Sequence, residues 1–598
     1  MPISPLQGAI DNVTVVVKIE GTQIDDSVSI LSVRVDKQVN RIATAEVQLV
    51  LPIGTGDDKT FLLTEKELYV PGKSIEISIG YHSNEEKVFE GIIVAQSIRG
   101  RANSENTIVM KCSHKAIQLA MGRKSTYFKD KKDSDILSGI ISGAGLTADV
   151  EATTYQHKQL IQYKSIDWDF ILSRAEANGL IVYTEKDKVY AKKPLSSGAA
   201  ELVLTYGKDV LAFDGSLESR FQMSGVTCKA WDMKTQDLIE GQSQSPTLSA
   251  LGNLDGDKMG TDISLGTSDS EVTGPLEKAE LKDWANAQML KARLAAKRGS
   301  ITFIGNAKPA LNTLIELAGF GKRYNGDALI TGVTHEVQEG NWETSISYGL
   351  SPEMYYQQRE VNAPPAGGLL PSTHGLVNST VKKIDADPDG EHRIQVDVPV
   401  IAKSGDGIWA RLSNFYSTNA KGVFFMPEIG DEVVLGFLNN DPRHPIILGS
   451  LYSSKLAPPY TADPDNKIKA IVTKNELKIE FDDDQKILTI ATPAGNQFIL
   501  SDADKSITLK DQNGNKMVTD DKGILIDSSK DITLKAAGKI DITANQNITT
   551  KSSGGDVAIQ GLNVNAKAQV AFSAQGSASA ELKASGQTTV KGAMVMIN

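Results

Sequence analysis

An eight-residue repeat near the C-terminal end of this 598-residue chain constrains its fold more than any other feature. Four isoleucines recur at intervals of eight residues, at Ile524, Ile532, Ile540 and Ile548. A second set lies two residues after the first, at Ile526, Leu534, Ile542 and Thr550. Because side chains at i and i+2 lie on the same face of a strand, each unit predicts one short strand with an inward pair, followed by a polar turn.

One such unit is too short to bury its apolar pair alone, so it must stack on neighbouring units. Two arrangements meet this need. One is a single-chain parallel β-helix with several units per coil. The other is three chains wound together, each supplying one strand per level, which closes every sheet edge. Weaker pairs surround the repeat, at Leu488/Ile490, Ile507/Leu509, Val557/Ile559 and Val570/Phe572.

Two proline-rich breaks divide the chain, and at this length several domains are expected. The breaks are "VNAPPAGGLLPSTHG" and "KLAPPYTADPDN", which have paired prolines and little apolar periodicity. We predict five segments: a hub at 1–360, a linker at 361–374, a small barrel at 375–455, a second linker at 456–477 and the repeat domain at 478–598.

The predicted hub is mainly β with some helix. Its strands alternate polar and apolar residues, as in "NVTVVVKIEG", "VSILSVRVDKQ", "TAEVQLVL" and "SIEISIGY". We expect two β-rich barrels with helical connectors. Three helices are predicted: 134–146 with Ser134 as N-cap, 165–180 with Phe170, Ile171 and Ala175 on one face and a stop at Gly179, and 276–299 with Pro275 at its start and Lys297-Arg298-Gly299 at its end.

No local pattern points to a catalytic, cofactor or metal site. No histidine lies within five residues of another, and HExxH, GxSxG, P-loop and GxGxxG motifs are absent from the sequence. The acidic run at 480–486 is interpreted as a hairpin turn rather than a calcium site. Cys112 and Cys228 are expected to be buried free thiols. Glycosidase carboxylates have no local signature, so an envelope-degrading enzyme stays open as an alternative.

Charge and hydropathy restrict the partners of the chain. The net charge is -11 and no basic stripe with interleaved aromatic residues is visible, which argues against a nucleic-acid partner. The first residues show no signal peptide, and no window approaches the roughly 18 apolar residues of a membrane span. We therefore expect synthesis in the cytoplasm and no stable membrane insertion.

The run from Met426 to Tyr452 resembles the OB-domain core of VgrG proteins, and five or so strands in 375–455 fit a small closed barrel of the OB type. The segment 165–180 is similar to a helix in the hub domains of VgrG and phage late-control proteins, and the eight-residue repeats resemble their β-helical needle. The residues that match the OB pattern are Pro427, Gly430, Glu432, Val433, Phe437, Leu438, Asp441, Pro442, Pro445, Ile446 and Gly449.

This resemblance implies a homotrimeric spike at the tip of a contractile injection apparatus: a type VI secretion system, an extracellular phage-tail-like particle or a phage tail. The implied partners are the inner tube protein at the N-terminal hub, baseplate proteins, a PAAR-type tip protein at the C-terminus and possible effector cargo. The family architecture adapts a sixfold tube to a threefold needle, which favours the intertwined trimer. The implied needle core is then Ile524, Ile526, Ile532, Leu534, Ile540, Ile542 and Ile548.

Two departures from related spikes imply a chain without catalytic residues or cofactors. The short linker at 456–477 leaves no room for the lysozyme domain that some phage spikes insert there, and the chain ends in repeat-like sequence rather than an effector domain. An adhesin or tail fibre is a further alternative, but it does not explain the OB core. The candidate surface for docking the tip protein, with plugging of the last rung as the alternative role, is Met594, Val595, Met596 and Ile597.

Overall fold

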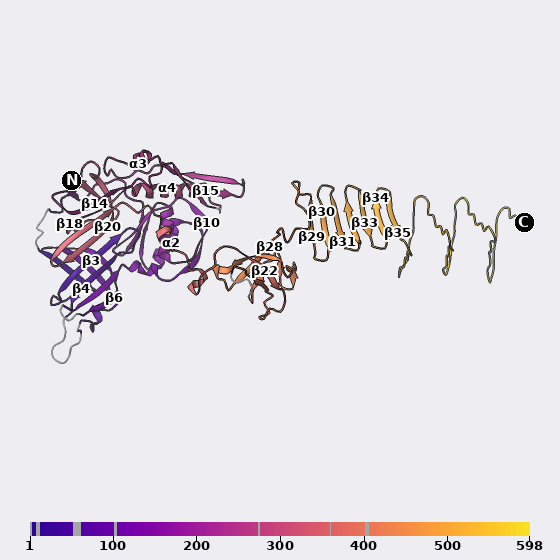
Figure 1. Cartoon of the computed structure of the whole chain (residues 1–598), viewed down its shortest axis with the longest axis horizontal. Helices are drawn as coiled ribbons and strands as arrows, with labels where there is room; N and C mark the ends of the chain where they lie inside the picture. The colour runs from indigo at the N-terminus through magenta and orange to yellow at the C-terminus, as the bar shows by residue number, and fades with distance from the viewer. Residues whose placement is uncertain are drawn as a thin grey trace. The chain divides into compact units, whose positions relative to one another are not determined.

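The computed structural model describes the chain in two units (Figure 1). The described residues are 3–6, 12–51, 61, 63–100, 105–272, 275–358, 360–400 and 406–597. The first unit is Met1–Leu451 and the second is Tyr452–Asn598. Within the described ranges, no helix is both long enough and apolar enough to cross a membrane.

The hub is built on a 13-stranded sheet that runs through both of its halves. Antiparallel pairing of β3 with β20 joins the two halves. The strands in order are β14 (Val210–Leu217), β18 (Lys297–Ile304), β21 (Asn341–Tyr348), β20 (Gly326–Gln338), β3 (Ile30–Gln38), β4 (Thr44–Val50), β7 (Thr107–Ser113), β6 (Asn84–Arg99), β5 (Ser74–Tyr81), β1 (Val13–Ile19) and β2 (Thr22–Gln23), with β13 (Val203–Thr205) and β19 (Leu314–Ala318) beside β20.

The strand alternation predicted from the sequence gives this sheet two separate cores. Ile75, Ile77 and Ile79 of β5 point into one core beneath the first half, since alternate residues of a strand share a face. Ile301 and Phe303 of β18 point into a second core beneath the other half. The two expected barrels are therefore two cores on one continuous sheet.

Helices α1 (Asp133–Gly143) and α2 (Asp167–Ala177) form a third core with the 3₁₀ helix η2 (Lys115–Ala120) and a small sheet. The predicted inward residues Phe170, Ile171 and Ala175 are all buried, and Gly179 follows α2 with a positive φ of 70°. The predicted N-cap Ser134 is wrong, because α1 begins one residue earlier and Lys132 is its N-cap. The strands of the small sheet are β9 (Thr147–Val150), β11 (Ile181–Glu185) and β12 (Lys188–Lys192).

The predicted end of the third helix is also wrong. Helix α4 spans Lys278–Leu294, and residues 297–299 begin strand β18 instead. Gly299 lies between two strands, where a Cβ atom would come within 2.1 Å of the Asp214 carbonyl oxygen. Glycine is thus needed here for close approach of strands, not for ending a helix.

Helix α4 covers one face of a three-stranded sheet. Val226, Cys228 and Ala230 of the central strand pack against it. Cys112 lies on β7 in a different core, so both thiols are buried and free, as predicted. The strands of this sheet are β16 (Asp237–Gln242), β15 (Gly225–Asp232) and β17 (Thr267–Val272), and the short helix α3 (Gly256–Asp262) precedes β17.

Strands β8 (Lys124–Lys132) and β10 (Gln156–Ser165) form a two-stranded ribbon. This ribbon gathers basic and aromatic residues that show no basic stripe in the sequence. Its two strands together contain six lysines and one aspartate, with Tyr127 and Tyr163 exposed between them. The sequence showed no basic stripe with aromatic residues because the ribbon combines two segments separated by α1.

Residues 377–450 form a closed five-stranded barrel, as predicted. Its own core includes Ile394, Val433 and Ile447. The predicted linker at 361–374 is hydrogen-bonded at both of its ends. The Val361 carbonyl accepts a hydrogen bond from Arg123, and the Thr373 amide donates to the Asn440 carbonyl. The barrel strands are β22 (Val377–Lys383), β23 (Ile394–Asp397), β24 (Ile408–Leu412), β28 (Pro445–Ser450) and β27 (Glu432–Phe437).

The second unit contains a seven-stranded antiparallel ladder in chain order (Figure 1). The first strand lies inside the range that was predicted as a linker, so the ladder begins before residue 478. The turn predicted at 480–486 is shorter than expected: residues 480–482 belong to β30, and the turn to the paired strand β31 covers 483–486. The strands are β29 (Ile468–Val472), β30 (Lys478–Asp482), β31 (Ile487–Ala491), β32 (Gln497–Ser501), β33 (Ser506–Lys510), β34 (Lys516–Asp520) and β35 (Gly523–Asp527).

Candidate functional site

The second unit has almost no core of its own. Among its described residues, Ala491 and Ser501 are the two that are buried. The five-stranded barrel, which is shorter, buries eight apolar residues in one cluster. A folded segment has to offset its conformational entropy by burying apolar surface, and a large exposed apolar surface marks an interaction site.

The register of the ladder places one row of apolar residues on a single face. Antiparallel pairing sets Ile490 opposite Phe498, Phe498 opposite Leu509, and Leu509 opposite Met517. Met517 lies opposite Ile526 in the next strand. Directly opposed residues share a face, so these five side chains form one continuous row.

A second row lies two residues away on the same face. It contains Leu488, Leu500, Ile507, Thr519 and Ile524, each opposite the next. The predicted inward pairs at 488/490, 507/509 and 524/526 are therefore brought together on one face.

Sequence reasoning missed four members of these rows: Phe498, Leu500, Met517 and Thr519. The pairs that they form, at 498/500 and 517/519, are out of register with the eight-residue repeat, because the turns between these strands differ in length from those of the repeat. The alternation in "QFILS" and "KMVTD" is the signal that would have located them. The opposite face is mixed, with Glu480, Thr489 and Thr508 along its central row.

Beyond β35 the eight-residue period continues in the backbone. Every described residue from 529 to 597 is exposed, and none belongs to a paired strand (Figure 1). A single-chain β-helix would pair successive rungs with one another, and this segment does not. Bends in the backbone recur at 529–530, 537–538, 545–546, 553–555, 562, 569–570, 577–578, 585–586 and 593–594.

The predicted core residues of the repeat lie just after these bends. Ile532, Ile540 and Ile548 each follow a bend by two residues. In one chain these side chains are exposed, with Ile540 at 53%, and so are the remaining predicted core residues, Ile524, Ile526, Leu534 and Ile542. The candidate docking residues Met594, Val595, Met596 and Ile597 are exposed as well. Both assignments stay predictions.

The OB motif lies along the closing strands of the barrel. Gly430 takes a positive φ of 95° in the turn before β27, and its amide donates to the Val381 carbonyl of β22. Glu432 opens β27 and accepts a hydrogen bond from Asn378. The Asp441 carboxylate accepts three bonds from Arg443, at its amide, Nε and Nη2.

The remaining motif residues shape the turn between β27 and β28. Phe437 ends β27, Pro442 follows Asp441 in the turn, and Pro445 starts β28. Gly449 lies in β28 opposite Val434. Arg443 holds the pKa of Asp441 down to about 2, so the turn is fixed by a charged pair at neutral pH. The motif therefore maintains the fold of the barrel.

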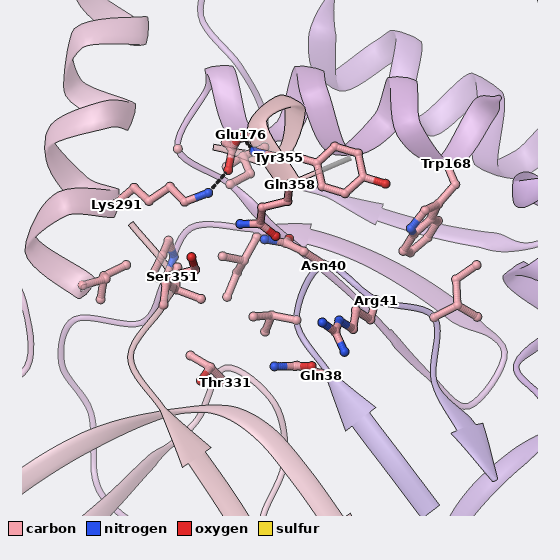
Figure 2. A pocket seen from close by; sticks show the side chains of 18 of the residues that line it. Gln38, Asn40, Arg41, Trp168, Glu176, Lys291, Thr331, Ser351, Tyr355 and Gln358 are labelled. Atoms are coloured by element: carbon pink, nitrogen blue, oxygen red, sulfur yellow. Dashed lines mark hydrogen bonds and ion pairs between the residues drawn. The ribbon is translucent and has the colours of Figure 1, made fainter. Parts of the chain in front are cut away.

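A cavity of about 640 Å³ lies in the hub between the start of β4, helices α2 and α4, and the segment 349–358 (Figure 2). Glu176 of α2 and Lys291 of α4 form an ion pair in its wall. The second oxygen of Glu176 accepts a bond from the Tyr355 amide at 2.7 Å. Arg41 lies at the exposed side of the cavity, and Trp168 lines its apolar wall.

The two serines that line this cavity hydrogen-bond away from any base. Ser113 donates to the His114 carbonyl at 3.3 Å, and Ser351 accepts from the Glu353 amide. Neither serine is therefore paired with a general base, which activation of a serine nucleophile requires.

A buried ionic cluster connects the hub helices. The Asp133 carboxylate accepts bonds from Arg174 at 2.8 and 2.9 Å, from Asn178 at 2.9 Å, and lies 3.0 Å from His157 Nε2. Burial raises the pKa of Asp133, but the bonds from Arg174 and His157 outweigh it and hold this pKa well below its usual range. Arg174 also lies 3.6 Å from Glu280 of α4, so the cluster joins α1, β10, α2 and α4.

No group of three or more histidine, cysteine, aspartate or glutamate side chains in the described part of the chain is placed to hold a metal ion.

Comparison with known proteins identifies two domains. Residues 9–339 match the Alg8 N-terminal domain family. Residues 377–452 match the type VI secretion system/phage-baseplate injector OB domain family, which coincides with the closed barrel.

Curated relatives cover parts of the chain. The type VI secretion system spike protein VgrG1b of Pseudomonas aeruginosa is 22% identical over 421 residues, or 65% of this chain and 55% of that protein. The actin cross-linking toxin VgrG1 of Vibrio cholerae is 27% identical over 163 residues, or 25% of this chain and 14% of that protein. The chain thus spans about half or less of these relatives.

Among solved structures, the 43 kDa tail protein of prophage MuSo2 from Shewanella oneidensis aligns with a TM-score of 0.42 and 14% identity. The alignment covers 57% of this chain and 98% of that one.

Proposed function

Because the chain belongs to the Alg8 N-terminal domain family and is a VgrG-like spike protein, we propose that it forms the tip of a contractile injection apparatus. In this role it acts as a structural hub and spike. This role is the same in a type VI secretion system, an extracellular phage-tail-like particle and a phage tail, so the proposal covers all three.

One observation carries the proposal: the second unit exposes the apolar residues that should form its core. Three copies wound together would supply the missing core, with the two apolar rows of each ladder turned toward the threefold axis. Beyond residue 528, each chain would place one eight-residue segment on each level. Strand edges would then be closed by neighbouring copies, which spreads mechanical load along the ladder.

The energetic gain from this assembly would be large. Burying one isoleucine or leucine contributes about 1.5–3 kcal/mol, and each level of three chains would bury several. Ile524, Ile526, Ile532, Leu534, Ile540, Ile542 and Ile548 are the core residues of this needle.

The same proposal assigns partners to the two ends. The hub would bind the inner tube and baseplate proteins and adapt the sixfold tube to the threefold needle. Residues 594–597 would dock a PAAR-type tip protein, and effector cargo would travel with the particle out of the producing cell or into a target cell. The exposed apolar side chains at 594–597 support the tip assignment.

We further propose that the chain has no catalytic activity of its own. One of the curated relatives named above is a spike protein, the two serines that line the hub cavity are not paired with a general base, and the OB motif serves the barrel fold. An envelope-degrading enzyme is therefore not favoured.

Electron microscopy of tubes assembled from the partnering tube protein tests this function. With the purified full-length chain present, we expect one end of each tube to carry a hub that tapers to a thin needle. Tubes whose ends stay bare at saturating chain would contradict the proposal. Hydrolysis of purified cell wall by the chain, abolished by one Asp or Glu substitution, would favour the enzyme instead.

A further inference from the structure

The hub presents a basic sheet face with exposed aromatic and aliphatic side chains, including Tyr127 and Ile161. In the ribbon of β8 and β10, Tyr127 lies opposite Ile161, and Lys129 lies opposite Gln159. The other face of the ribbon packs inward through Phe128, which stacks on Phe170 at 5.8 Å. The outer face therefore has apolar side chains in its centre and lysines around them.

The outer face of this ribbon is open and positively charged. Tyr127 is 75% exposed and Tyr163 is 69% exposed, values far above those of hub core residues. Lys129 and Lys131, which share a face with Tyr127, form no ion pair with any described residue. Six lysines against one aspartate give the ribbon a net charge of +5, within a chain whose net charge is -11.

A second uncovered sheet face in the hub has the opposite charge. Helix α4 covers one face of the sheet β16-β15-β17, and the other face carries Trp231 opposite Leu238. Beside them, Lys229 lies between Glu240 and Glu271 of the two flanking strands. Trp231 and Leu238 are exposed, as is Met233 in the adjoining turn at 67%.

The acidic groups on this sheet outnumber the basic ones. Lys229 lies 2.7 Å from Asp269 and 3.9 Å from Glu240, so the sheet's single strand lysine is shared between two carboxylates. The three acidic residues on the same face as Trp231 are Glu240, Asp269 and Glu271.

We propose that the basic ribbon of one copy binds the acidic sheet of the next copy, which closes three hubs into a ring. The inference rests on the proposed trimer and names the hub surfaces that would form it. Each face has an apolar centre and a charged rim, which is the usual anatomy of a protein interface. The charges are complementary, so the contact is selective for this orientation.

A second copy fits these surfaces better than the alternatives. Two different patches that bind head to tail generate a closed ring when the rotation between copies closes, as in a trimer. Both patches are sheet faces, and in one chain both are exposed. Nucleic acid would need a larger basic surface than one ribbon on a chain of net charge -11.

Crosslinking of the full-length chain tests this contact. In the variant Tyr127→Cys with Leu238→Cys, a short bismaleimide should link copies into covalent dimers and trimers on a denaturing gel. Cys112 and Cys228 are buried and should stay unreacted. Tyr127→Cys with Leu211→Cys is the matched control, because Leu211 is also exposed but lies on β14. The control should give no covalent dimers or trimers on the gel.

Charge reversal gives a second, independent measurement. Lys129→Glu with Lys131→Glu should slow the crosslinking by about tenfold or more, since like charges would face each other. Adding Glu240→Lys with Glu271→Lys, on the open face of the acidic sheet, should restore it. Lys186→Glu with Lys208→Glu changes the charge equally at exposed turns elsewhere and should have no effect.

The outcomes separate this inference from the proposed function. A native trimer that forms no links between copies, or that links only within one chain, would overturn the ribbon–sheet contact and leave the spike intact. A native mass of one chain would overturn both. Nucleic acid that copurifies with the native chain and is lost in the Lys129→Glu/Lys131→Glu variant, without any crosslink, would assign the ribbon to nucleic acid and overturn the inference.

Discussion

Asp133 shows how single residues stabilise the hub. Its carboxylate is buried, with 2% of the residue exposed, yet it stays charged because Arg174, Asn178 and His157 surround it. A buried charge on α1 with partners on β10 and on α2 and its C-cap fixes the relative positions of these elements. Loss of the charge would leave Arg174 buried with Glu280 as its remaining carboxylate within 4 Å among the described residues.

Asp133→Asn should therefore lower the stability of the hub by about 3 kcal/mol at pH 7, as expected for breaking a buried pair. The pKa of Asp133 is lowered in the folded state, so its contribution is present above the unfolded value of about 3.9 and is lost as the pH falls below it. Calorimetry of the native chain and of the variant should show a lower unfolding temperature of the hub in the variant. This difference in unfolding temperature should narrow below about pH 4.

The matched control for this prediction is Asp130→Asn. Asp130 is exposed in the ribbon and has a positive φ of 52°, a conformation that asparagine tolerates. This variant should unfold like the native chain at every pH. A difference in unfolding temperature between Asp133→Asn and the native chain that stays constant down to pH 2 would contradict the proposed role of the charge.

Ile540 is the residue that tests the proposed needle core. Ile540→Asp would place three carboxylates at one level of the core. In the ionised form these buried charges would repel one another, and in the protonated form the apolar surface of isoleucine would still be missing. We expect this variant to fail to form trimers in size-exclusion chromatography. Thr543→Asp adds the same charge at a position between the inward pairs and should remain trimeric. A trimeric Ile540→Asp chain with unchanged heat resistance would show that Ile540 does not point inward.

At the level of elements, the ladder β29 to β35 has one apolar face and one mixed face. Leu509→Glu changes the apolar row, whereas its neighbour Thr508→Glu changes the central row of the other face. Loss of one buried leucine per chain costs about 2 kcal/mol, and three copies are affected at once. The thermal midpoint of the trimer should therefore fall clearly for Leu509→Glu and little for Thr508→Glu. Equal effects of both substitutions would refute the inward orientation of this face.

Much of this ladder could be predicted from the sequence, because strands with strong alternation determine their own faces. The pairs at 488/490, 507/509 and 524/526 were predicted as inward and share one face. The helix at 165–180, a turn within 480–486 and the closed barrel were also predicted, since each depends on local patterns.

Other features could not be predicted because they depend on contacts between distant segments. Lys297, Arg298 and Gly299 read as a helix end, but their pairing with β14 and β21 makes them a strand. The basic ribbon appears only when β8 and β10 pair, and its lysines are spread over two segments. The row through Phe498 and Met517 has no regular spacing, because turn lengths in the ladder vary.

At the level of the whole molecule, the two units differ in how they are stabilised. The hub and barrel contain several buried cores and a network of buried ion pairs. The second unit contains a regular ladder and an eight-residue period but almost no buried side chains among its described residues. This contrast is what we expect if the first unit folds within one chain and the second requires other copies.

The stoichiometry of the intact chain tests this conclusion most directly. Native mass spectrometry of the purified full-length chain should give three times the 64.3 kDa of one chain, at concentrations down to the nanomolar range. Intertwined chains would dissociate only on unfolding, so dilution should not release monomers. A species of 64.3 kDa with the second unit resistant to protease would contradict the intertwined spike.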